Sequence, residues 1–226
     1  MASDILLEAT GIAKHYGAVV ALRNASLSVR RGEVHALMGA NGAGTNGGRI
    51  LIDGREHVVR SPAEARRAGL VSVYQEPALI PDLDIASNLR LTATPVEPFM
   101  KWVREMGVPD LDLRETARNL PLAILRVLDL ARAIAVGPEV LLLDEMTAAL
   151  PADLAEKVLA VVKRQGAEGR SVIFISHRML EISALCDRAT VLRDGETVGV
   201  VDIGPGSADR IVELMLGQKV ERIQRE

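Results

Sequence analysis

Short, largely apolar runs that alternate with helical stretches constrain the fold of this chain most. Val140–Leu143, Ser171–Ile175 and Leu70–Tyr74 have the length and composition of buried strands. Helices are expected between and after such runs, at Ala152–Arg164 and Met179–Leu185. Strands that are apolar on both faces are typical of parallel sheets, whose crossover connections are helices. The sequence therefore predicts an α/β fold around a mostly parallel sheet that is covered on both faces.

The remaining elements follow from the same patterns. Further strands are expected at Ile5–Glu8, Val19–Leu22, Ala25–Val29, Glu33–Met38, Arg49–Ile52 and Ala189–Arg193, and a last helix at Ser207–Leu216. Ser61, Pro62 and Glu64 form a capping box with proline at the first helical position. They predict a helix that ends near Ala68 and Gly69.

The stretch from Ala78 to about Val136 differs from the rest, because strand patterns vanish there. Helices are expected at Asp84–Leu91, Glu97–Met106 and Leu120–Ala135. We interpret residues 78–136 as a small helical subdomain inserted into one domain of residues 1–226. Residues 1–77 and 137–217 would form its core, and residues 218–226 a linker or tail.

Composition excludes several classes of protein. The net charge is −3, and the aromatic residues are five in all, so neither a basic surface nor a base-stacking platform for nucleic acid is expected. The single cysteine, Cys186, suits a reducing compartment. The N-terminus lacks the pattern of a secretory signal, and no apolar run reaches the length of a membrane span. We therefore expect a soluble, cytosolic chain without nucleic-acid partners.

A glycine-rich stretch, Gly39–Gly48, follows the strand expected at Glu33–Met38. Gly39 and Gly44 have the spacing of a phosphate-binding loop, G-x-x-x-x-G-K-[ST], whose backbone N–H groups surround phosphate oxygens. The residues that would supply these groups are Gly39, Ala40, Asn41, Gly42, Ala43, Gly44 and Thr45. Thr45 and Asn46 stand where Lys and Ser or Thr belong, and a strand is expected next instead of a helix.

This stretch has two other interpretations. Gly42, Gly44 and Gly47 match the dinucleotide fingerprint formally, but that motif must open a helix. A strand follows, which argues against it. A glycine-rich hairpin loop without a ligand remains open on the evidence of the loop alone.

Polar side chains stand at the carboxyl ends of three apolar strands, where parallel sheets bind ligands. Asp144 and Glu145 follow Val140–Leu143, His177 follows Ser171–Ile175, and Gln75 follows Leu70–Tyr74. In nucleotide hydrolases such a pair of acids divides two tasks: Asp144 would hold Mg²⁺ through a water and Glu145 would polarise the attacking water. His177 would contact a γ-phosphate. A solvated acidic turn and a structural histidine are the alternatives, and the upstream glycine loop favours the site.

On these motifs the chain resembles the ATP-binding cassette of ABC transporters over nearly its whole length. More narrowly, it resembles the N-terminal cassette of the tandem ATPases of monosaccharide importers, of the ribose, galactose or xylose type. The resemblance is carried by the stretches Glu33–Gly44, Val71–Glu76 and Phe174–Arg178. It implies a P-loop NTPase-like fold with an antiparallel β subdomain and a small helical subdomain.

The resemblance also implies site residues, cofactors and partners. Tyr16 would stack on adenine, Gln75 would link Mg²⁺ to a transmembrane partner, and Glu145 and His177 would be catalytic, with ATP and Mg²⁺ as cofactors. The partners would be permease subunits, a second cassette and, indirectly, a periplasmic or extracellular sugar-binding protein. The chain would then lie at the inner face of the cell membrane. A strand-edge role for Tyr16 stays open.

The chain departs from the family pattern in three places. The lysine and helix of the phosphate loop are absent, as if by an in-frame deletion or a segment that was not observed. Leu120–Ile124 stands where the signature Leu-Ser-Gly-Gly-Gln belongs, and Met146 stands where the family has proline. A catalytically inactive cassette with a structural or regulatory role is therefore the alternative, and a cassette protein without a transporter is a third.

Overall fold

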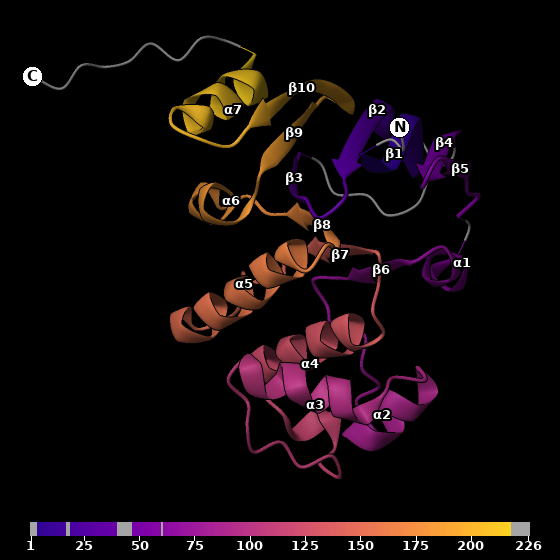
Figure 1. Ribbon diagram of the computed structural model, residues 1–226, viewed down its shortest axis with the longest axis vertical. Helices are drawn as coiled ribbons and strands as arrows, with labels where there is room; N and C mark the ends of the chain where they lie inside the picture. Colours follow the sequence, from indigo (N-terminus) through magenta and orange to yellow (C-terminus); the bar gives the residue numbers. More distant parts are fainter. Residues whose placement is uncertain (1–3, 17–18, 40–46, 60, 218–226) are drawn as a thin grey trace, which may run out of the picture.

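A ten-stranded mixed sheet runs through the molecule (Figure 1). The computed structural model describes residues 4–16, 19–39, 47–59 and 61–217. The strands are β1 (Ile5–Tyr16), β2 (Val19–Arg30), β3 (Val34–Met38), β4 (Gly47–Ile52), β5 (Arg55–Glu56), β6 (Leu70–Val73), β7 (Val140–Asp144), β8 (Ser171–Ile175), β9 (Arg188–Arg193) and β10 (Glu196–Asp202). Across the sheet their order is β5-β4-β1-β2-β10-β9-β3-β8-β7-β6.

Eight helical segments complete the described part of the chain. They are α1 (Pro62–Arg67), α2 (Ile85–Leu91), α3 (Val96–Glu105), the 3₁₀ turn η1 (Ala117–Asn119), α4 (Leu122–Ala135), α5 (Ala152–Ala167), α6 (Met179–Leu185) and α7 (Ser207–Leu216). The predicted cap of α1 is confirmed, because the Ser61 hydroxyl accepts a hydrogen bond from the Glu64 backbone N–H at 3.2 Å.

The strands β9, β3, β8, β7 and β6 are neighbours in that order, and all of these pairs are parallel. The register sets Val140 of β7 beside Ser171 of β8, and Asp144 beside Ile175. Because parallel neighbours run in one direction, their carboxyl ends finish at one edge of the sheet. The predicted parallel core is confirmed.

The other part of the sheet is antiparallel except where β10 meets β2, a pair that is parallel. β1 pairs with β2 and with β4, β4 pairs with β5, and β10 pairs with β9. A strand, β4, occupies the positions from Gly47 onward, as the sequence predicts for Arg49–Ile52. The mixed sheet thus contains the antiparallel part that the family resemblance implied.

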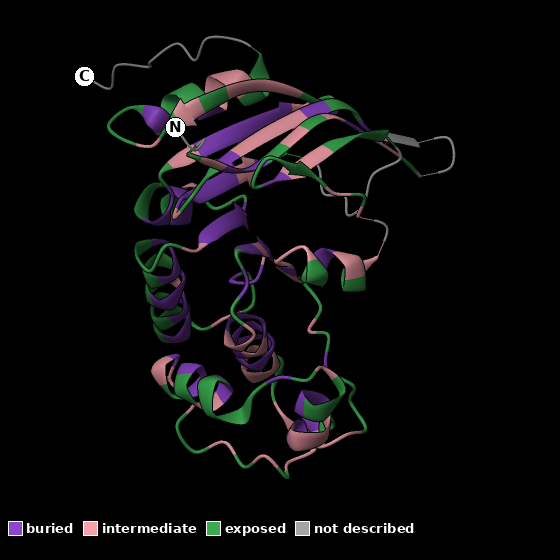
Figure 2. Ribbon diagram, turned by 45° about the vertical axis from the view of Figure 1, so that its right-hand side comes forward, coloured by how far each residue is buried: buried purple, intermediate pink, exposed green. Residues whose placement is uncertain are grey.

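The two faces of the parallel strands are covered differently (Figure 2). On one face Leu143 and Phe174 are fully buried in a core that includes Leu128 of α4, Val158 of α5 and Ile182 of α6. On the other face the cover comes mainly from strands, with Ala68 at the end of α1 beside them. There Val140 and Ile173 pack in a second cluster with residues of the antiparallel strands, namely Leu6, Leu7, Val29 and Ile52.

Helices α2, α3 and α4 lie together on the far side of the core from the antiparallel strands (Figure 1). Asp84 caps α2 by accepting a hydrogen bond from the Ser87 backbone N–H at 2.6 Å. An isolated β-bridge joins Asp84 to Thr116, which lies in the connection between α3 and α4. Glu105 of α3 forms an ion pair with Arg164 of α5. The segment is therefore tied both to itself and to the core.

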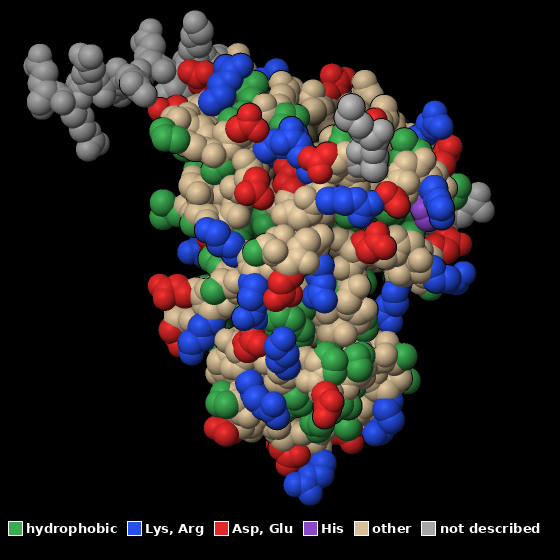
Figure 3. Space-filling view, viewed as in Figure 1, with side chains coloured by type: hydrophobic (Ala, Val, Ile, Leu, Met, Phe, Trp, Pro, Cys, Tyr) green, Lys and Arg blue, Asp and Glu red, His purple; other side chains and the backbone are tan. Residues whose placement is uncertain are grey.

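The surface carries both signs of charge. On the face shown in Figure 3, Lys and Arg side chains are interspersed with Asp and Glu, which fits the net charge of −3. None of the helices in the described ranges is long and apolar enough to cross a membrane.

Candidate functional site

Four neighbouring parallel strands bring most of the predicted polar residues to one edge. In the order β3-β8-β7-β6, these strands are followed or ended by Gly39, His177, Asp144 with Glu145, and Gln75. Asp144 and Glu145 are half-buried, whereas Gln75 and His177 are exposed. This is the edge at which ligands bind in open α/β sheets.

Glu145 and His177 are in direct contact. The His177 Nδ1 lies 3.0 Å from the Glu145 Oε1, with the histidine side chain 70% exposed and the glutamate side chain 21% exposed. Glu145 also has a positive φ of 45°. A non-glycine residue in this region carries strain of about 1–3 kcal/mol, and such strain clusters at functional sites. Its backbone N–H donates to Ile175 O at 3.0 Å, which holds the strained residue against β8.

Asp144 ends β7 with an oxygen that lacks a protein partner. Its Oδ1 is buried and accepts no hydrogen bond within the described residues. Burial, and next the charge of Glu145, raise the pKa of the Asp144 carboxyl above its ordinary value. A buried carboxylate oxygen without a partner suits a hard cation such as Mg²⁺.

The surroundings of Asp144 favour a magnesium site that is shared with a ligand. No cluster of three or more His, Cys, Asp or Glu side chains in metal-binding arrangement occurs in the described ranges. Mg²⁺ commonly uses one or two protein ligands and completes its shell with water and phosphate oxygens. Asp144 and the exposed amide of Gln75, two residues beyond the end of the neighbouring strand β6, fit that pattern.

We expect Asp144→Asn to stabilise the protein in the absence of ligands by about 0.5–2 kcal/mol at pH 7. The raised pKa means that the ionised carboxylate is disfavoured in the folded state. The protonated form therefore contributes stability that is present below the ordinary pKa of 3.8 and is lost as the pH rises. The extra stability of the variant over wild type should thus vanish near pH 3. Urea unfolding at several pH values measures this difference, with Asp110→Asn, at an exposed position, as the control. Equal stability of wild type and variant at pH 7 would contradict this account.

Gly39 is the one residue of the predicted loop that the structure describes. Its φ is 137°, and a Cβ there would lie 2.6 Å from the Leu192 Cβ, so close packing against β9 alone requires glycine. Ala40, Asn41, Gly42, Ala43, Gly44 and Thr45 lie outside the described residues. Tyr16 ends β1, and its side chain also lies outside the described part. The loop and adenine interactions therefore remain predictions.

A buried carboxylate that was not predicted, Glu181 of α6, lies between the loops that carry Glu145 and His177. It accepts hydrogen bonds from Thr147 Oγ1 at 2.8 Å, from Ser176 Oγ at 3.2 Å and from Arg178 Nη1 at 2.5 Å. The only signal in the sequence was the spacing of Arg178 and Glu181, which is that of an i, i+3 pair on a helix.

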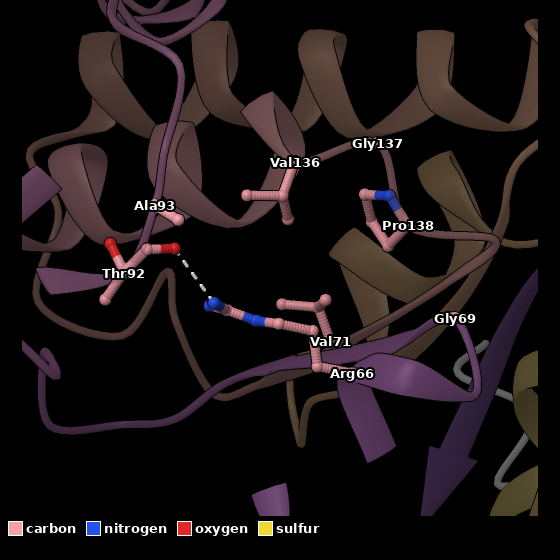
Figure 4. A pocket seen from close by; sticks show the side chains of 8 residues that line it. All are labelled: Arg66, Gly69, Val71, Thr92, Ala93, Val136, Gly137 and Pro138. Atoms are coloured by element: carbon pink, nitrogen blue, oxygen red, sulfur yellow. Dashed lines mark hydrogen bonds between the residues drawn. The ribbon is translucent and has the colours of Figure 1, made fainter. Parts of the chain in front are cut away.

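A cavity of about 260 Å³ lies away from this edge (Figure 4). Gly69 and Pro138, which precede β6 and β7, line it together with Arg66 and Thr92. It therefore opens at the amino ends of the strands. Arg66 Nη1 donates to the Thr92 carbonyl at 3.0 Å across it, joining α1 to the end of α2. This cavity is distinct from the candidate site.

Comparison with known proteins agrees with this architecture. The nucleotide-free ATP-binding cassette of an ABC transporter superposes with a TM-score of 0.76 at 20% identity, covering 92% of this chain and 95% of that one. The ADP conformation of another such cassette superposes with a TM-score of 0.76 at 22% identity, covering 96% of this chain and 100% of that one. These likenesses establish the α/β fold of P-loop NTPases.

Sequence relatives are more similar. The chain is 36% identical over 245 residues to "Ribose import ATP-binding protein RbsA 1" of Rhizobium etli, covering 98% of this chain and 48% of the relative. It is 37% identical over 237 residues to "Ribose import ATP-binding protein RbsA 2" of Streptomyces avermitilis, covering 94% and 47%. The chain thus spans about half the length of the curated relatives it matches. The model of the family described as "ABC transporter" matches residues 22–148, more than half of the sequence. This chain belongs to the ABC transporter family.

Proposed function

We propose that the chain is the ATP-binding subunit, or half-subunit, of a sugar-type ABC importer. The observation that carries the proposal is the meeting of Asp144, Glu145 and His177 at adjacent strand ends, with the 3.0 Å contact between the last two. The named relatives are ribose import proteins, which favours a monosaccharide as the transported substrate. Transport by this chain would require permease subunits, a second cassette and, indirectly, a sugar-binding protein. It would place the chain at the inner face of the membrane.

Each site residue has a proposed task in binding and hydrolysis. Asp144 and Gln75 would hold Mg²⁺, and the bound ion would offset the negative charge of the phosphates. Glu145 would orient the attacking water and accept its proton. His177 would hold Glu145 in place through Nδ1 and contact the terminal phosphate with the rest of its ring. Tyr16 would stack on adenine, and residues 39–45 would donate backbone N–H groups to phosphate.

We further propose that the chain has two parts and a terminal extension. Residues 1–77 and 137–217 would form the nucleotide-binding core, residues 78–136 a helical subdomain that docks the permease, and residues 218–226 a linker or tail. The bridge between Asp84 and Thr116 and the grouping of α2, α3 and α4 support this division. The Arg66–Thr92 and Glu105–Arg164 interactions would then lie at the boundary between the two parts.

The alternative is an inactive cassette, and a specific observation favours it. Gly47 already lies in β4, and the sequence has Thr45 where the loop lysine belongs. The alignment with the Rhizobium etli relative, at 245 residues, is longer than the whole chain of 226 residues. Some aligned positions therefore have no counterpart here, which agrees with a deleted segment after Gly44.

Restoring that segment tests the proposal. Insertion of Lys-Ser-Thr and about ten helical residues after Gly44 should tighten Mg-ATP binding by at least about tenfold. A charge-assisted contact from lysine contributes about 1.5–3 kcal/mol, and the helix adds oriented N–H groups and its dipole. Titration with a fluorescent ATP analogue, with and without Mg²⁺, measures the affinity.

The matched control is the same insertion with alanine in place of lysine, which should recover only part of the gain. Equal micromolar affinities of the original and restored chains would show that the proposed loop does not bind the phosphates. Failure of every version to bind Mg-ATP would favour the inactive cassette. Co-purification with a permease would separate a transporter subunit from a cassette protein that acts alone.

A further inference from the structure

The side chain of Glu181 joins two loops that belong to different strands. Thr147 follows β7 and stands two residues after Glu145, while Ser176 and Arg178 flank His177 after β8. One carboxylate oxygen, Oε2, accepts hydrogen bonds from both Thr147 and Ser176. One buried side chain is therefore hydrogen-bonded to residues that lie within two positions of Glu145 and of His177 in the sequence.

Burial makes these contacts consequential. Glu181 is 7% exposed, Thr147 2% and Ser176 6%. A buried carboxylate without partners is costly, so the three hydrogen bonds fix the relative positions of the groups that donate them. The Ser176 hydroxyl also accepts the Arg178 backbone N–H at 3.1 Å, which shapes the turn that presents His177.

Stabilising α6 does not account for all of these contacts. Glu181 lies in the first turn of that helix, and the bonds from Ser176 and Arg178 are local. The bond from Thr147 is not local, because it crosses 34 residues of sequence to the loop after β7. That loop contains the strained Glu145, and a residue at positive φ persists only where its surroundings over-determine it.

We propose that Glu181 is a positioning residue that holds the loop of Glu145 against the loop of His177. It acts through its hydrogen bonds with Thr147 and Ser176, and its described hydrogen bonds do not include Glu145 or His177. The catalytic meaning of the pair rests on the proposed function, whereas the contact itself does not. Arg126 of α4 supports the same loop from another side, since its Nη1 donates to the Met146 carbonyl at 3.4 Å.

The ring resonances of His177 provide a test that needs no nucleotide. The chain has four histidines. The signals that disappear from ring-selective heteronuclear NMR spectra of a His177 variant are therefore those of His177. Glu145→Gln marks where the His177 signals lie once the charged partner is gone. We expect Glu181→Gln and Thr147→Val to move these signals at least about halfway towards that position, at one constant pH. Thr147→Ser, which retains the hydroxyl, should restore the wild-type spectrum.

The controls separate positioning from general stability. Glu213→Gln removes an i, i+3 ion pair with Arg210 on α7 and should leave the His177 signals unchanged. The double variant Thr147→Val with Glu181→Gln should shift the signals no further than Glu181→Gln alone, because Thr147 acts only through its hydrogen bond to Glu181. If Glu181→Gln does not fold, the His177 signals of Thr147→Val alone test the proposal.

Wild-type His177 signals in a folded Glu181→Gln or Thr147→Val protein would overturn the proposal. Because the samples contain no ATP, an inability to bind ATP would leave this result standing and would count only against the proposed function.

Discussion

Replacing Glu145 by glutamine should lower phosphate release from ATP by about 10²–10⁴-fold while changing Mg-ATP affinity little. That factor is the usual contribution of a positioned general base, and it corresponds to roughly 3–5 kcal/mol of the barrier. The argument rests on geometry: Glu145 follows the buried end of β7, contacts His177 at 3.0 Å and is held in a strained conformation. Glutamine preserves the size and most hydrogen bonds of the side chain but cannot accept a proton from water.

Steady-state phosphate release and analogue titration, performed on the same preparations, measure the two quantities. Glu213→Gln on α7 is the matched control, because it makes the same chemical change at an ion pair with Arg210 that includes neither Glu145 nor His177. If the chain as it stands releases no phosphate, the comparison is made in the background with the restored loop. Equal, nonzero rates for wild type and Glu145→Gln would remove Glu145 from the mechanism.

The parallel core and the strand-end residues could be predicted from the sequence because local pattern determines both. An apolar run such as Val140–Leu143 can hardly be anything but a buried strand in this context, and a parallel arrangement brings the ends of such strands to one edge. The positions of Gln75, Asp144, Glu145 and His177 followed from that rule alone. Their roles in catalysis and metal binding stay predictions.

Elements without a clear alternation were harder to predict. β1 continues to Tyr16, well past the expected Ile5–Glu8, because an irregularity in pairing between Ala9 and Ile12 lets the strand run on through Gly11. β10 (Glu196–Asp202) is not among the strands that the sequence predicts. It too contains a break in register, between Thr197 and Gly199, which disrupts the period of two.

Polar networks between distant segments have no local signal at all. Thr147 and Glu181 are 34 positions apart, and Glu33 and Arg188 are 155 apart. Nothing in either segment alone shows that its charge is satisfied by the other. The Glu33 network is the clearest example, and it joins the parallel and antiparallel parts of the sheet.

Glu33, directly before β3, lies at the centre of a buried ionic cluster. Arg188 of β9 donates to it from Nε at 2.6 Å and from Nη2 at 3.0 Å, and His35 Nδ1 lies 2.9 Å from Oε1. The same guanidinium donates to the Ser28 carbonyl of β2 at 2.9 Å, so one group links β9, β3 and β2. Burial alone would raise the pKa of Glu33, but the hydrogen bonds from His35, Arg188 and the Arg30 backbone outweigh it and lower the pKa to about 2.

Replacing Glu33 by alanine should therefore destabilise the protein by about 3–5 kcal/mol at pH 7, which is the usual cost of leaving a buried charge without its partner. Domains of this kind are stable by only about 5–15 kcal/mol, so the loss would be a large fraction of the total. Because the folded pKa is depressed, the contribution of Glu33 is complete above its ordinary value of 4.5 and is lost as the pH falls towards about 2. The difference in the free energy of unfolding between wild type and variant should narrow over that pH range.

Urea unfolding at pH 7, 4 and 2.5 measures this difference. The matched control is Asp53→Ala, which removes an exposed ion pair with Arg31 and should cost at most about 1 kcal/mol. If Glu33→Ala is too unstable to purify, Glu33→Gln retains hydrogen-bond acceptance without the charge and should lose an intermediate amount. A Glu33→Ala protein as stable as the Asp53→Ala control would show that the link between β9, β3 and β2 contributes little to the free energy of unfolding. The packed clusters on the two faces of the sheet would then be sufficient to join its parallel and antiparallel parts.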